Sequence, residues 1–190
     1  MGKLPNFFNF FSGESKEKDT PKPPAPTIHL NNTEFHNICN NGKREFKNRI
    51  LDNIDLKKMS LQGLYFENCH FQLMDLRGVS LKDANLEQCN FGGMNLLQFD
   101  FTNATLNGSS FEATDLRGSN FAGATLTKVN FSYANLYYAC LRGTNLSEAN
   151  LQSAELTHAN FKHANLSNAN LNNSNLAWAD FSHSNLCGAS

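Results

Sequence analysis

The chain repeats a large apolar residue with a period of five. From Leu51 to Leu186, every fifth residue is Leu or Phe, without an exception in 28 consecutive positions. This period fits neither an α-helix, whose inward face recurs every 3.6 residues, nor a strand, whose inward face recurs every two. A strict short repeat is typical of a solenoid, in which each unit buries its apolar residue against the next unit. The pattern therefore predicts a solenoid over residues 51–190.

Small and polar residues follow the same period. If the Leu or Phe is called position i, position i−2 is mostly Ala, Ser, Thr, Val or Cys, and position i−1 is mostly Asn, Asp, Ser or Thr. The unit is plain in residues 149–153 (ANLQS) and 164–168 (ANLSN). These residues resemble the A-(N/D)-L-x-x unit of the pentapeptide-repeat family. The resemblance implies an all-β, right-handed quadrilateral β-helix of about seven coils, in which four pentapeptides make one coil and positions i and i−2 point inward.

Aligning residues twenty apart gives columns of like residues. One column holds only Leu, and Phe71, Phe91, Phe111 and Phe131 fall in another. Position i−2 carries larger side chains near the N-terminus, among them Ile54, Met74, Met94 and Phe99. Because larger inward groups need more room, we expect the first three coils to be wider or differently turned than the last four.

Two segments precede the repeats. Residues 1–27 are predicted to be a disordered tail, because residues 12–27 (SGESKEKDTPKPPAPT) are rich in Pro and charge and have nothing to bury. Residues 28–50 are predicted to cap the first coil, with Phe35, Ile38 and Cys39 at helical spacing and Gly42 ending that turn.

The tip of the tail has helical apolar spacing of its own, at Leu4, Phe7, Phe8 and Phe11. Such a tip predicts docking into a partner groove, weak contact with a membrane surface, or a leader for a bacterial secretion system.

Composition and charge exclude several classes of protein. The net charge is −1; residues 1–50 carry eight Lys/Arg against five Asp/Glu, and residues 51–190 carry eight against twelve. Neither balance predicts a nucleic-acid partner, and no apolar run approaches the ~20 residues of a transmembrane segment. Five cysteines without a C-x-x-C pair indicate reduced thiols. We therefore expect a cytoplasmic protein, or one secreted by a bacterial effector system without a cleaved signal peptide, and no cofactor.

Aromatic and histidine side chains gather at outward positions near the C-terminus. Tyr138, His158 and Trp178 fall in one i+2 column, and Tyr133 and Tyr137 are close by in the sequence. This cluster, together with His163 and His183, predicts contact with a protein partner of unknown identity, or a homodimer through the C-terminal coil. The alternative is that the rings only cover coil edges.

Three histidines cluster in the same region, at His158, His163 and His183. No Asp, Glu or Cys completes an obvious tetrahedral set around them, so we expect no metal site.

Acidic and amide side chains form columns at position i−1. Asp55, Asp75, Asp115 and Glu155 share one column and suggest a mimic of DNA phosphates, but Lys57, Arg77 and Arg117 stand two residues after the aspartates and neutralise them. The resemblance is relevant here, because quinolone-resistance members of the family bind DNA gyrase and tend to carry a loop that breaks the repeat frame. This chain has no such break. The Asn columns are interpreted as satisfying the backbone at tight corners.

No catalytic set is recognisable. The sequence has no nucleophile-and-base arrangement or Gly-rich phosphate loop, and a packed solenoid is expected to lack the concave site that catalysis needs. The predicted function is therefore a non-enzymatic protein-binding scaffold or adaptor, including a secreted bacterial effector. The alternatives are a topoisomerase-binding protein of the quinolone-resistance type and, from another class, a metal-dependent enzyme at the histidines.

Overall fold

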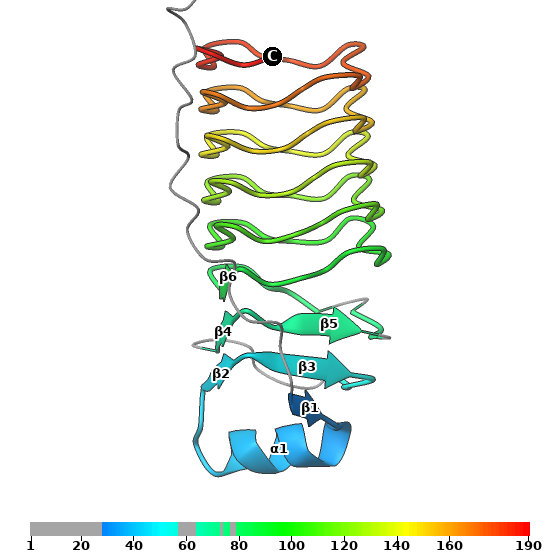
Figure 1. Ribbon diagram of the computed structural model, residues 1–190, viewed down its shortest axis with the longest axis vertical. Helices are drawn as coiled ribbons and strands as arrows, with labels where there is room; N and C mark the ends of the chain where they lie inside the picture. The colour runs from blue at the N-terminus through cyan, green and yellow to red at the C-terminus, as the bar shows by residue number, and fades with distance from the viewer. Residues whose placement is uncertain (1–27, 57–63, 73, 77–78) are drawn as a thin grey trace, which may run out of the picture.

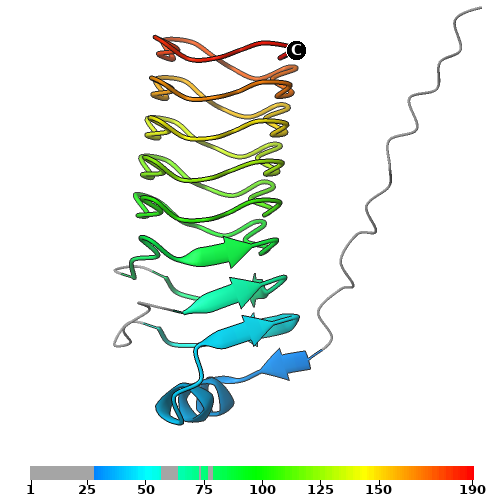
Figure 2. The ribbon, with the colours of Figure 1, turned by 90° about the vertical axis from the view of Figure 1, so that its left-hand side faces the viewer.

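The computed structural model describes residues 28–56, 64–72, 74–76 and 79–190. Within them the chain forms a column of stacked coils with one helix at its N-terminal end (Figures 1 and 2). The elements are β1 (Ile28–Leu30), α1 (Asn32–Asn40), β2 (Glu45–Lys47), β3 (Arg49–Asp52), β4 (Tyr65–Glu67), β5 (His70–Gln72) and β6 (Asn85–Glu87). The tail proposed to dock through Leu4, Phe7, Phe8 and Phe11 lies outside the described residues.

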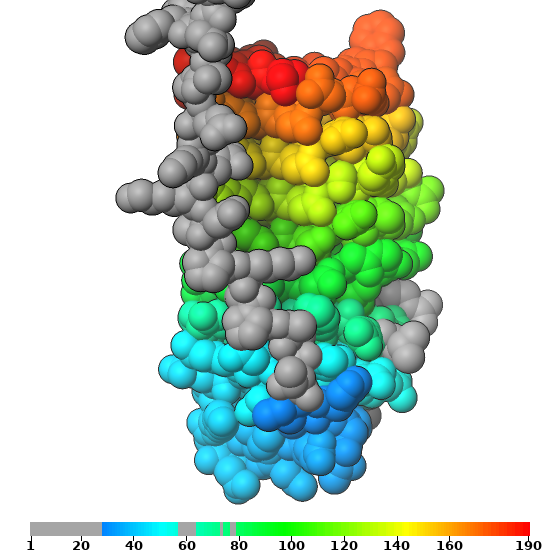
Figure 3. All heavy atoms as spheres, in the orientation of Figure 1, coloured from blue at the N-terminus to red at the C-terminus, as the bar shows by residue number. Residues whose placement is uncertain are grey.

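The coils pair in parallel with a register of twenty residues. The strand orders are β1-β3-β5 and β2-β4-β6, and Ile50 pairs with His70 as Tyr65 pairs with Asn85. Beyond β6 the pairing continues as single bridges between i−1 residues. Four successive bridges span one coil: Asn85↔Thr105, Asn90↔Ser110, Asn95↔Asp115 and Asp100↔Asn120. Four pairings in twenty residues give the column four faces, with successive coils visible as bands in Figure 3.

The corners among the described residues carry a left-handed residue at position i+2. At one corner the Ala134 amide donates to the Phe131 carbonyl over 3.0 Å, and the intervening Tyr133 has φ +59°. The described residues include nineteen non-glycine residues with positive φ, all at position i+2 of a unit. A positive φ at the third residue is the geometry of a type II turn, which glycine adopts without steric cost. Gly143, with φ +67°, occupies such a corner.

The core is a ladder of like residues, as predicted. Phe71, Phe91, Phe111 and Phe131 stack with ring centroids 4.6, 4.9 and 5.2 Å apart. Small i−2 residues such as Ala134 are buried beside the large ones. Each buried Leu or Phe contributes on the order of 1.5–3 kcal/mol before the entropy of ordering is subtracted.

Helix α1 covers the N-terminal end of this core. Asn31 and Glu34 form a capping box, in which each side chain accepts a hydrogen bond from the other residue's amide over 3.0–3.1 Å. The helical spacing seen in the sequence brings Phe35 onto Phe46, with ring centroids 4.7 Å apart, and both rings are buried. Gly42, with φ +83°, follows the helix.

The first coils are bonded differently from the later ones. β2 and β3 are separated by Asn48 alone, where later coils have a full turn. On the face that carries Met74 and Met94, the described bridges begin only at Asn95↔Asp115, and none joins Asp75 to Asn95. The coils before the third therefore differ from the later ones, as expected from their bulky i−2 side chains. The third coil, in contrast, bridges to the fourth as regularly as the later coils do, so the expectation of three unusual coils is only partly met.

Candidate functional site

Stacked aromatic rings line one corner of the last coils. The ring centroids of Tyr138 and His158 are 4.5 Å apart with an interplanar angle of 13°, and those of His158 and Trp178 are 6.3 Å apart at 11°. All three residues occupy the left-handed corner position, and Trp178 is 82% exposed. Tyr137 stands nearly perpendicular to Tyr138, 4.5 Å away at 86°. Partial desolvation, Tyr138 and Glu155 raise the pKa of Tyr137.

The predicted contact residues are only partly brought together. Tyr133 is exposed on the preceding corner, and no ring contact joins it to the other aromatics among the described residues. We call Tyr133, Tyr137, Tyr138, His158 and Trp178 the aromatic surface. Together they present apolar ring faces and polar ring edges to solvent, a combination that is enriched where proteins bind one another.

The three histidines fall into two columns. His158 lies between Tyr138 and Trp178, whereas His163 stacks on His183 at the next corner with ring centroids 5.0 Å apart. Over the described ranges, no group of three or more His, Cys, Asp or Glu side chains is placed to hold a metal ion.

Within the acidic column, Asp115 is neutralised by Arg117. Arg117 donates to both carboxylate oxygens of Asp115, over 2.8 and 2.7 Å. This contact lowers the pKa of Asp115. Glu155 higher in the column has a different environment: its oxygens accept hydrogen bonds from the Thr157 amide and the Asn175 side chain, each over 2.9 Å.

The asparagine columns serve the backbone, as interpreted from the sequence. The Asn130 side chain accepts from the Ser132 amide over 3.1 Å and also from the Asn150 side-chain amide over 3.2 Å. Asn165 repeats both contacts with Ser167 and Asn185. These amides hold corners and link coils, so their hydrogen-bonding capacity is largely used within the column.

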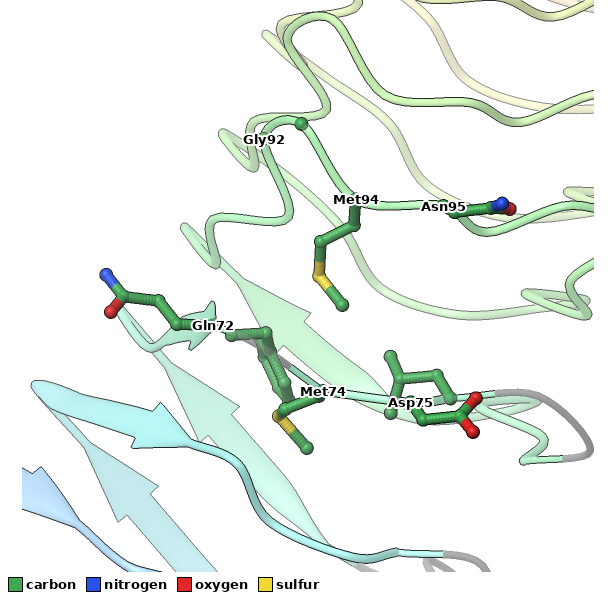
Figure 4. Close-up of a pocket in the computed structure, with 9 residues that line it drawn as sticks. Gln72, Met74, Asp75, Gly92, Met94 and Asn95 are labelled. Atoms are coloured by element: carbon green, nitrogen blue, oxygen red, sulfur yellow. The ribbon is translucent and has the colours of Figure 1, made fainter.

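An open cavity of about 740 Å³ lies beside Asp75 and Asn95, which no described bridge joins. Met74 and Met94 lie on facing coils of it, with Gln72, Asp75 and Asn95 at its edges (Figure 4). The expectation that a packed solenoid has no concave site is therefore wrong for these coils, because the bulky methionines keep them from closing. Among the described residues of the lining, Asp75 is the one carboxylate, and there is no histidine or cysteine. These described residues thus lack a second group for acid–base chemistry.

Comparison with known proteins gives the family. A model described as "Pentapeptide repeat region" matches residues 64–141, and one described as "Pentapeptide repeats (8 copies)" matches residues 149–188, together more than half of the chain. The chain belongs to the pentapeptide-repeat family. No curated protein sequence matches it significantly.

Solved structures agree with this family. QnrB1, a plasmid-mediated fluoroquinolone resistance protein, is 23% identical with a TM-score of 0.54, over 86% of this chain and 82% of QnrB1. Rfr23 from the cyanobacterium Cyanothece 51142 is 27% identical over 56% of this chain and 86% of its own, with a TM-score of 0.30. A pentapeptide repeat protein from the Arabidopsis thaliana thylakoid lumen is 32% identical over 55% and 70%, also with a TM-score of 0.30. The family match and the likeness to QnrB1 confirm the predicted quadrilateral β-helix, and the likeness to QnrB1 extends to the fold alone.

The thiols of this pentapeptide-repeat protein are all free. Cys39, Cys69 and Cys89 are buried, and Cys187 is exposed. Burial raises the pKa of Cys39 and, more strongly, that of Cys89, whereas a hydrogen bond with Cys89 lowers the pKa of Cys69. The part of the chain that the structure describes contains no helix long and apolar enough to cross a membrane.

Sequence reasoning missed two features of this pentapeptide-repeat protein. It did not predict the environment of Glu155, which no Lys or Arg follows two residues later as Arg117 follows Asp115. It also missed the cavity, for which the row of large i−2 residues was the available signal.

Proposed function

We propose that this pentapeptide-repeat protein is a non-enzymatic protein-binding scaffold, and that the aromatic surface is its contact site. The supporting observation is the stack of Tyr138, His158 and Trp178, whose rings contact one another and whose outer member is 82% exposed. A rigid column holds these rings in place before binding, so little ordering entropy opposes association. Exposed apolar clusters of this kind mark interaction sites.

One form of this proposal is a homodimer through the C-terminal coil. The inward Leu residues at position i of that coil are more exposed than those of the preceding coils, with Leu176 at 38% and Leu186 at 42%. A second copy packed on this coil would cover both leucines and adjoin Trp178.

The first experiment measures the solution mass of the intact protein by light scattering, beside Trp178→Ala and the control Leu97→Ala. Leu97 is exposed on an earlier coil and lies far along the column from Trp178. A dimer that only Trp178→Ala dissociates would establish the homotypic contact.

If all three proteins are monomers, the same set is used to capture proteins from a host lysate. A protein retained by wild type and Leu97→Ala but lost from Trp178→Ala would support the proposal. Equal assembly and equal capture by all three would refute it.

We further propose that residues 1–27 act as a docking or secretion segment of a cytoplasmic protein or a secreted effector. The helical apolar spacing of Leu4, Phe7, Phe8 and Phe11 supports this. Deleting residues 1–27 should leave the circular dichroism spectrum of the column unchanged and abolish partner docking or delivery. Full delivery and docking by the shortened protein would contradict the proposal.

A topoisomerase-binding role is the second candidate, and the charges favour it less. QnrB1 shares the fold at 23% identity, but Arg117 neutralises Asp115 in the column that would imitate phosphates. Salt separates the two candidates, because binding by a phosphate mimic falls steeply with ionic strength and an aromatic contact changes little.

A further inference from the structure

The part of the column that carries the aromatic surface contains no basic side chain other than histidine. Residues 131–140, 151–160 and 171–180 include no Lys or Arg, whereas Arg142 and Lys162 lie in the two stretches between them and Lys128 precedes the first. Because the register is twenty residues, those three stretches stack directly on one another and form two adjacent faces. These faces combine three tyrosines, one tryptophan, one glutamate and Asp180, which Lys162 of the neighbouring stretch pairs with at 3.1 Å.

Of the two carboxylates on these faces, Glu155 is held by hydrogen bonds, and its orientation is fixed. The Thr157 amide and the Asn175 side chain each donate to one of its oxygens over 2.9 Å. Partial desolvation opposes ionisation, but these hydrogen bonds outweigh it and lower the pKa of Glu155. The side chain is therefore ionised at neutral pH.

No cation within the described part of the chain pairs with Glu155. The other acidic side chains nearby do have such partners: Lys128 lies 3.4 Å from Glu148, and Lys162 lies 3.1 Å from Asp180. Each oxygen of Glu155 keeps a lone pair beyond its hydrogen bond, so the carboxylate can still accept two parallel N–H donors. The protein thus presents an oriented anion without its counter-charge.

Aromatic rings flank this anion. Tyr137 directly follows Leu136, whose amide donates to the Glu155 carbonyl over 2.8 Å, and stands two residues after Asn135, the bridge partner of Glu155. Its ring stands across the stacked rings, at 86° to Tyr138 and 82° to His158. The faces of tyrosine and tryptophan rings attract cations, most strongly Arg, whose flat guanidinium can stack on a ring while donating two hydrogen bonds to a carboxylate.

We propose that the aromatic surface together with Glu155 binds an arginine-bearing segment of a protein partner. The guanidinium would pair with Glu155 and stack on Tyr137 or its neighbours. This inference rests on the proposed function, because it names the chemistry of the partner at the same contact site. A lysine ammonium offers neither the planar stack nor the two parallel donors, so arginine is the preferred side chain. A nucleic-acid strand is disfavoured, because its phosphates would meet a carboxylate on faces without Lys or Arg.

The test is a nuclear magnetic resonance titration of the isotope-labelled full chain. The probes are a blocked Gly-Arg-Gly-Arg-Gly peptide and its lysine counterpart of equal charge. The expected result is that the arginine peptide shifts the amides of Tyr137 and Glu155 and the indole of Trp178, and binds about threefold or more tightly than the lysine peptide.

Three variants make this test specific. Glu155→Gln should weaken binding of the arginine peptide by about threefold, and Tyr137→Leu should remove the preference for arginine over lysine while keeping apolar bulk. The control Glu148→Gln, which changes an exposed carboxylate paired with Lys128, should bind like wild type. Circular dichroism verifies that each variant is folded.

Equal affinity for both peptides, shifts spread over all acidic residues, or wild-type binding by Glu155→Gln would overturn the inference. The proposed function is judged separately by assembly and capture with Trp178→Ala. If that substitution alters assembly or capture while the arginine peptide shows no selectivity, the contact site stands and its assigned partner chemistry is wrong.

Discussion

Replacing Phe111 by alanine should destabilise the column more than any substitution at its C-terminal coil. Phe111 is fully buried, stacks on Phe91 at 4.9 Å and Phe131 at 5.2 Å, and meets Phe101 and Phe121 edge-on at 5.4 and 5.8 Å. Removing a buried Phe costs about 3–5 kcal/mol, since the ring's transfer free energy is lost and a cavity remains. Four ring contacts and a backbone fixed by hydrogen bonds on both sides leave little room for collapse, so we expect the upper half of this range.

The matched control is Phe181→Ala in the last coil. Phe181 is partly buried and has one stacked neighbour, Phe161, with centroids 4.7 Å apart. Its removal should cost about 1–2 kcal/mol, because less apolar area leaves water on folding.

Urea unfolding followed by far-ultraviolet circular dichroism measures both costs. Trp178 fluorescence is a poor probe, since its side chain is 82% exposed in the folded protein. Hydrogen exchange is measured in parallel, because a repeat column can unfold in parts and a single free energy then loses its meaning. A loss below about 1.5 kcal/mol for Phe111→Ala, or one no larger than that for Phe181→Ala, would refute the view that stacked rings hold the column together.

Three further predictions follow from backbone strain, burial and charge. Gly143→Ala should lower the free energy of unfolding in urea by about 1 kcal/mol, because alanine is strained at the positive φ of this position. Gly123→Ala should lower it more, because the new Cβ would lie 2.6 Å from the Asn103 side-chain oxygen. Equal losses for the two variants would contradict this. A thiol reagent should modify Cys187 first and leave the three buried cysteines unmodified until the protein unfolds. The control Cys187→Ser should lose the fast phase of labelling. Rapid labelling of all five thiols would contradict the assigned burial. Hydrogen bonds from Ser182, then the contact with Lys162, lower the pKa of Asp180 to about 2, so its charge contributes stability above about pH 4, the unfolded pKa, and this contribution is lost as the pH falls toward 2. Asp180→Asn should therefore lower the melting temperature much more at pH 7 than at pH 2, where the carboxyl is about half protonated in the folded protein. An equal loss at both would show that charge is not responsible.

The five-residue period was sufficient to predict the column. Leu or Phe in phase through 28 units leaves no helix or flat strand able to bury them together. Register followed as well, because like residues recur every twenty positions, as the stacked Phe71 and Phe91 show. The same arithmetic places Tyr138, His158 and Trp178 in one column, because a repeating backbone turns sequence spacing directly into spatial order.

Other features needed the tertiary structure. The sequence does not show that position i+2 is left-handed, because only some of its residues are glycine and Tyr133, Lys128 and Trp178 occupy it too; the closing turn imposes that conformation on whatever residue is present. The large i−2 residues predicted unusual first coils, but the form that this takes depends on how Met74 and Met94 pack. In the structure a cavity lies between the coils that carry these methionines, and no described bridge joins Asp75 to Asn95. The sequence likewise does not show which charges pair. Asp115 and Glu155 share a column, but the side-chain positions show that Arg117 binds Asp115, whereas amide groups donate hydrogen bonds to Glu155. A repeat thus fixes where residues stand along the column, and side-chain packing decides what each of them contacts.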